Sequence, residues 1–147
     1  MSAKNSPSEI IEPVVSAQTA MVYVMVVAAV ADGDLKEDEV KTIADLVDML
    51  PVFKDLTGET ARGAISNCTD LLENEDGLDE VLSIIDHALP AHLTETAYAL
   101  ACDVVAADGV ATQEELRWLE MLRDKLNVSR LHAAAIEWGT RVRFAHE

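Results

Sequence analysis

The sequence has few basic residues and few aromatic ones. Eleven Lys and Arg stand against 27 Asp and Glu, which gives a formal net charge of -16, and only 4% of the 147 residues are aromatic. A surface this acidic repels phosphate backbones and anionic lipids, so binding to nucleic acid or to an anionic membrane surface is disfavoured. The partners that it favours are divalent cations and basic proteins. With so few aromatics, small aliphatic side chains have to form the core, which is typical of packed helices.

Cysteine and long apolar runs are scarce as well. Cys68 and Cys102 are the two cysteines, each inside an apolar helical pattern, so we expect buried free thiols in a reducing compartment rather than a disulfide framework. The longest apolar run, residues 20–31, is shorter than the roughly 20 residues that a membrane span requires. No basic start followed by an apolar stretch marks a signal peptide. These absences predict a cytoplasmic protein with no membrane span.

Motifs of catalysis and of zinc binding are missing too. No G-x-S-x-G, Walker or G-x-G-x-x-G pattern occurs, and no spacing places a nucleophile beside a base. The four histidines lack the short spacing of zinc ligands. None of the three Asp-Gly turns has acidic residues at the ligand positions of an EF-hand. The sequence therefore predicts a binding module and no enzyme.

Apolar residues recur with helical spacing along nearly the whole chain. Residues 1–7 are polar and are expected to form a flexible N-terminus, with a single helical domain over residues 8–147. Capping residues, Gly and Pro divide this domain into helices predicted at residues 8–31, 36–50, 57–73, 78–89, 92–107, 112–126 and 129–143. No segment alternates as a strand would. The predicted fold class is all-α, a compact bundle of about seven helices.

The last predicted helix has an apolar stripe and a basic end. Leu131, Ala135, Trp138 and Val142 form the stripe and are expected on the inner side of the helix. Arg130, Arg141 and Arg143 complement the helix dipole or pair with an acidic face of another copy. In the predicted helix 92–107, Asp103 is the one charge after Tyr98 and is expected to be solvated.

Two segments of the chain repeat each other at a distance of 76 positions. The shift places Asp32-Gly33 on Asp108-Gly109 and Glu39 on Glu115. Apolar positions agree as well, and Val40 and Leu116 are expected on the inner side of their helices. Each copy has the pattern of an apolar helix, a turn at a glycine that readily becomes left-handed, and an amphipathic helix. The bundle should therefore contain two helix–Asp-Gly-turn–helix repeats related by approximate two-fold symmetry.

The acidic residues at these turns allow two interpretations. Glu39 and Glu115 lie in the first turn of a helix, where they stabilise the dipole, and Glu115 completes a capping box with Thr112. Asp32 and Asp108 follow the last turn of an apolar helix, where the dipole disfavours an anion. They either cap the following helix or bind a cation together with backbone carbonyls. The predicted site comprises Asp32, Asp34, Glu39, Asp108 and Glu115, with calcium or magnesium as the cation.

The repeated segments AVADGDLKEDEVKTIADLVDML and VVAADGVATQEELRWLEMLRDKL resemble the repeated signature of the tellurite-resistance TerB family. The resemblance extends from about Val14 to Phe144. It implies an all-helical, pseudo-symmetric cytoplasmic domain tied to tellurite or general stress responses, with acidic residues near the paired turns that bind divalent cations. Val110 departs from the pattern, because it stands where the first copy has Asp34.

Two functions follow as expectations. The first is a TerB-like stress-response module that binds divalent cations weakly through its Asp-Gly turns and catalyses nothing. The alternative is a protein–protein interaction domain with an acidic docking surface, in which the turns are purely structural. A homo-oligomer is compatible with either function.

Overall fold

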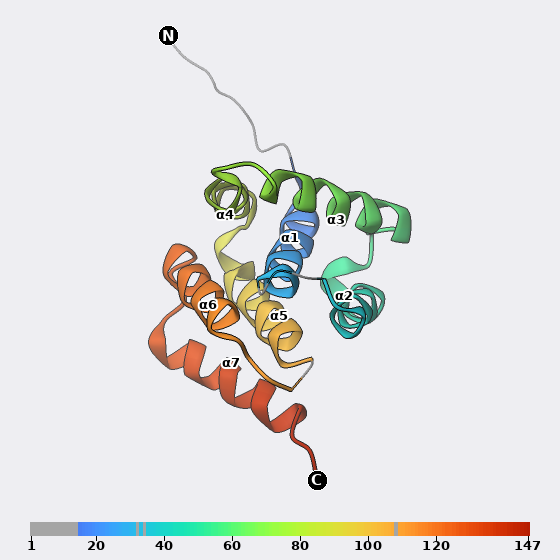
Figure 1. Ribbon diagram of the computed structural model, residues 1–147. Helices are drawn as coiled ribbons and strands as arrows, with labels where there is room; N and C mark the ends of the chain where they lie inside the picture. The colour runs from blue at the N-terminus through green and yellow to red at the C-terminus, as the bar shows by residue number, and fades with distance from the viewer. Residues whose placement is uncertain (1–14, 32, 34, 108) are drawn as a thin grey trace.

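The computed structural model describes residues 15–147 with the exception of 32, 34 and 108. These residues form seven α-helices, two short 3-10 helices and no strand (Figure 1). The elements are, in chain order, α1 Ala17–Val30, α2 Glu37–Met49, η1 Pro51–Phe53, α3 Gly58–Leu72, α4 Gly77–Ala88, η2 Ala91–Leu93, α5 Thr94–Ala106, α6 Gln113–Lys125 and α7 Arg130–Arg143. The predicted all-α fold class is confirmed.

Helix α1 lies at the centre of the bundle (Figure 1) and is buried on all sides. From Ala20 to Ala29 no side chain is more than 4% exposed. The helix packs against α3, α4 and α5, and also contacts α2 and α6. The apolar run of the sequence fits this position, because a helix without a polar side has to be surrounded by other helices. No helix in the described part of the chain is long and apolar enough to cross a membrane.

Hydroxyl side chains cap four of the helices. The Oγ atoms of Ser16, Thr57, Thr112 and Ser129 each accept a hydrogen bond of 3.1 Å from the backbone N–H three residues later. Such a bond satisfies one of the backbone donors left free at a helix start. The caps at Thr57, Thr112 and Ser129 confirm the prediction. The first helix begins at Ala17 instead of near Ser8, which lies outside the described residues.

Both predicted glycine turns have the left-handed backbone that the sequence indicates. Gly33 has a φ of 110° and Gly109 a φ of 84°. Their N–H groups donate to Val30 O at 2.9 Å and to Ala106 O at 3.0 Å, which are equivalent positions of the repeat. Each turn therefore ends an apolar helix in the same way. The two-fold relation between the halves stays a prediction.

Helix α7 buries the side opposite to the one predicted. Leu131, Trp138 and Val142 are 76%, 62% and 59% exposed, and Ala135 is exposed as well. The inner side instead carries Ala133, Ile136, Glu137 and Thr140. The expectation of an inner apolar stripe on this helix was wrong.

Polar contacts with α5 explain this orientation of α7. Tyr98 Oη donates to Glu137 Oε2 at 2.5 Å, Thr140 Oγ1 donates to Asp103 Oδ1 at 3.2 Å, and Arg143 Nη2 donates to the same oxygen at 2.5 Å. The Asp103 side chain is only 14% exposed, so the prediction that it is solvated was wrong. Buried polar groups need hydrogen-bond partners, and turning the apolar stripe of α7 inward would remove these.

Candidate cation site

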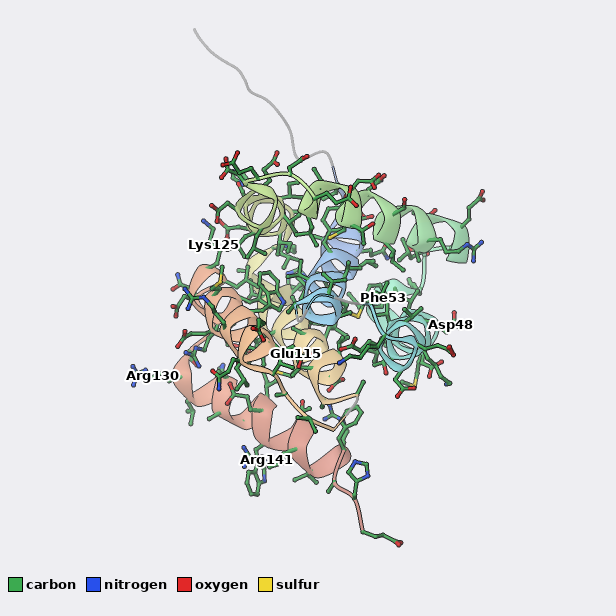
Figure 2. All side chains as sticks on the ribbon, viewed as in Figure 1. Asp48, Phe53, Glu115, Lys125, Arg130 and Arg141 are labelled. Atoms are coloured by element: carbon green, nitrogen blue, oxygen red, sulfur yellow. The ribbon has the colours of Figure 1, made fainter. Side chains whose placement is uncertain are left out.

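The two glutamates of the repeat are fully buried. Glu39 in α2 and Glu115 in α6 are both 0% exposed, although each lies in the first turn of its helix. Figure 2 shows Glu115 on the side of α6 that faces the other helices, whereas Arg130 lies on the outer side of α7. Buried glutamates are rare unless they are paired or bind an ion.

Because these two glutamates are buried, the apolar residues that helical spacing predicts to be buried are exposed instead. Val40 and Leu116, each the next residue along the chain, are 38% and 47% exposed. The expectation that these two residues face the core was wrong for both helices. Each helix is instead oriented so that the glutamate in its first turn is buried. This first turn follows the Asp-Gly turn along the chain.

One oxygen of each glutamate secures the start of its helix. Glu115 Oε1 accepts from Thr112 N at 2.8 Å, while Thr112 Oγ1 accepts from Glu115 N, which confirms the predicted capping box. Glu39 Oε1 accepts from Lys36 N at 3.3 Å, with the same spacing along the chain. Helix capping is therefore one role of both residues.

The second oxygen of Glu115 is shielded from solvent and has no hydrogen-bond partner in the described part of the chain. A buried carboxylate oxygen in that state is costly, and a bound cation removes the cost. Calcium and magnesium prefer carboxylate and carbonyl oxygens, so the donor chemistry fits a hard cation.

The structure describes two of the five predicted ligands. Asp32, Asp34 and Asp108 lie outside the described residues, so their positions relative to Glu39 and Glu115 are not tested. Among the side chains that are described, no three His, Cys, Asp or Glu residues gather as a metal-binding group.

Both cysteines are free and buried, as predicted. Burial raises the pKa of Cys68 and of Cys102 from 9.0 to about 12. Both thiols are therefore protonated at neutral pH, and it is the thiolate form that binds metals and attacks electrophiles. We therefore expect neither thiol to bind a metal or to act as a nucleophile at neutral pH.

The raised thiol pKa values predict an alkaline loss of stability. Between pH 9 and pH 12 the unfolded chain releases thiol protons that the folded chain retains, so the free energy of unfolding falls as pH rises. From pH 8 to pH 10 we expect a loss of about 1 kcal/mol for each thiol, measured by urea denaturation. The Cys68→Ala, Cys102→Ala double variant should lose less over this interval. An equal loss in the variant and the parent chain would contradict this origin.

The fold and these turns define a class of protein: an acidic all-helical module in which two Asp-Gly turns lead into helices with buried first-turn glutamates. The chain belongs to the TerB family. The family model described as Tellurite resistance protein TerB matches residues 18–137, a range that includes both turns and both glutamates. Comparison with curated proteins and with solved structures gives no match.

Proposed function

We propose that this TerB-family chain is a cytoplasmic module of tellurite or general stress responses that binds divalent cations weakly and performs no catalysis. The observation that carries the proposal is the fully buried Glu115, whose Oε2 lacks a hydrogen-bond partner among the described residues. The two free, buried thiols are in keeping with a reducing compartment.

The proposed ligands are Glu115 and Glu39 together with Asp32, Asp34 and Asp108 of the preceding turns. The repeat places Asp32 and Asp108, and likewise Glu39 and Glu115, at equivalent positions, and the net charge of -16 favours cation uptake. Calcium is preferred to magnesium, because irregular loops suit its flexible coordination. A bound cation would reduce the repulsion between carboxylates and would thereby stabilise the folded chain.

Calcium titration of thermal unfolding tests the proposal. The melting temperature should rise with calcium beyond the shift that sodium chloride gives at equal ionic strength. At a calcium concentration of 100 times the Kd, the stabilisation is about 2.7 kcal/mol. Glu115→Gln keeps an oxygen that accepts from Thr112 N but removes the charge, so it should reduce the calcium increment. Glu59→Gln is the matched control, since Glu59 is an exposed first-turn glutamate of α3, and it should leave the increment unchanged.

The same calcium titration is also applied to a variant in which both turn aspartates are replaced. The Asp32→Asn, Asp108→Asn double variant should lose the calcium increment and, relieved of repulsion, should be no less stable in chelator. A double variant that keeps the whole calcium response, or that is strongly destabilised in chelator, would show that these carboxylates are capping groups only.

The charge distribution favours one alternative function. Between Leu35 and Leu89 the chain has 14 acidic residues and 4 basic ones. An acidic surface over α2, α3 and α4 would dock basic proteins, with association that weakens as salt screens the charges. In this alternative the Asp-Gly turns are purely structural, and the calcium titration gives no saturable increment.

A further inference from the structure

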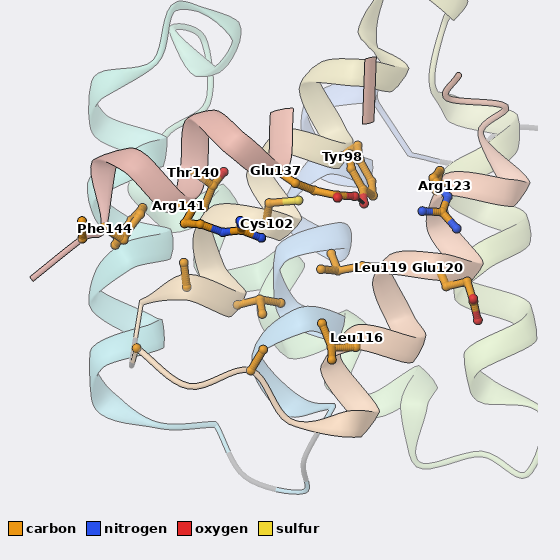
Figure 3. Close-up of a pocket in the computed structure, with 15 residues that line it drawn as sticks. Tyr98, Cys102, Leu116, Leu119, Glu120, Arg123, Glu137, Thr140, Arg141 and Phe144 are labelled. Atoms are coloured by element: carbon orange, nitrogen blue, oxygen red, sulfur yellow. Dashed lines mark hydrogen bonds between the residues drawn. The ribbon is translucent and has the colours of Figure 1, made fainter. Parts of the chain in front are cut away.

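A second candidate site, distinct from the buried glutamates, lies between α5, α6 and α7 (Figure 3). It is a cavity of about 560 Å³, within the range of about 300–1,000 Å³ that is typical of small-molecule pockets. Its apolar wall comes from α5, α6 and the segment after α7, through Val105, Leu116, Leu119 and Phe144. Its polar wall carries Tyr98, Cys102, Arg123 and Glu137. A cavity with these two walls fits a ligand that is itself amphipathic.

Two neutral groups, the Tyr98 hydroxyl and the Cys102 thiol, belong to the polar wall. Tyr98 is 1% exposed, and its hydroxyl donates to Glu137 Oε2 at 2.5 Å. Burial, and next this hydrogen bond, raise the pKa of Tyr98, so the hydroxyl stays a donor at neutral pH. The Cys102 thiol, 4% exposed, likewise stays protonated. In Figure 3, Cys102, Glu137 and Tyr98 lie together at one side of the cavity, and Arg123 reaches toward them from α6.

Four charged residues line the cavity. Glu120 and Arg141 are exposed, and the other two, Glu137 and Arg123, do not pair with each other in the described part of the chain. Both Glu137 and Arg123 are half-buried. Within the described residues, the ion pairs of the structure involve neither of them. Glu137 therefore faces the cavity without a cationic partner, and Arg123 without an anionic one. Half-buried charges are stabilised by a partner of opposite sign, and charge-assisted hydrogen bonds are the strongest that such groups make.

We propose that the cavity binds a small zwitterion with an apolar body, of the class of apolar α-amino acids. The ligand's ammonium group pairs with Glu137 and its carboxylate with Arg123. The ligand's side chain packs against Leu116 and Leu119, which line the cavity from α6. A ligand with one charge would leave either Glu137 or Arg123 without a partner, whereas a zwitterion satisfies both.

Isothermal titration of the full chain with three related probes tests the assignment. The probes are L-phenylalanine, N-acetyl-L-phenylalanine, which lacks the positive charge, and L-phenylalaninamide, which lacks the negative charge. L-phenylalanine should bind about tenfold more tightly than either derivative, which is the lower end of what a charge-assisted hydrogen bond contributes. Absence of saturable binding of L-phenylalanine, or equal binding of all three probes, would overturn the proposal.

Single substitutions assign each charge of the ligand to its residue. Arg123→Gln should abolish the preference for L-phenylalanine over the amide and keep the preference over the N-acetyl form. Glu137→Gln should do the reverse, and its side-chain oxygen still accepts from Tyr98. Arg130→Gln, an exposed change on α7 away from the cavity, is the control and should keep both preferences. Because each result is a ratio of affinities within one variant, a change in folding cannot imitate it. Variants that keep both preferences would refute the assignment.

Discussion

The Gly77→Ala variant is expected to lose about 3 kcal/mol of its free energy of unfolding, at the upper end of what an overpacked buried site usually costs. A Cβ at Gly77 would lie 2.2 Å from the carbonyl oxygen of Leu71 and 2.8 Å from Leu72 Cα. Both atoms belong to the backbone at the end of α3, so no side chain can rotate away to make room. The junction between α3 and α4 would have to open.

Gly63→Ala is the matched control for this substitution. Gly63 lies inside α3, and a Cβ there meets nothing within 4 Å. Alanine in a helix interior is more favourable than glycine by about 0.5–1 kcal/mol, so this variant should be more stable than the parent chain. Urea denaturation gives both values. A Gly77→Ala variant that loses less than about 1 kcal/mol would mean that α3 and α4 do not approach this closely.

The Met25→Ala variant should lose about 3 kcal/mol, because it opens a cavity in the middle of the bundle. Met25 is 0% exposed in α1, which other helices surround, so little can move in to fill the space. The same substitution at Met49, which is 69% exposed at the end of α2, should change stability by no more than about 0.5 kcal/mol. Equal effects of the two substitutions in urea denaturation would contradict the central position of α1.

Features that depend on local chemistry were predictable from the sequence. Thr57, Thr112 and Ser129 mark helix starts because a hydroxyl at that position satisfies a backbone N–H of the first turn. Gly33 and Gly109 mark helix ends because glycine adopts a positive φ without strain. The burial of α1 was also predictable, since its side chains offer no polar face to water.

Features that depend on distant partners were not predictable. The exposed stripe of α7 has the spacing of a core-facing stripe, and the contact that turns it outward joins Tyr98 to Glu137, 39 positions along the chain. Helical spacing counts Glu115 as a polar residue and Leu116 as a core residue, and the structure reverses both assignments. The cavity between α5, α6 and α7 follows from how three helices pack together, and no local pattern contains that information.

The central position of α1 also governs the order in which the chain can fold during its synthesis. Its buried surface is completed by α5 and α6, and α5 begins only at Thr94. A nascent chain that ends before that residue contains the most apolar of the described helices and lacks the helices that cover one of its sides. Exposed apolar surface of this kind is what chaperones bind and what drives aggregation. Among the helices that the structure describes, the one earliest in the chain is therefore among the last to complete its packing.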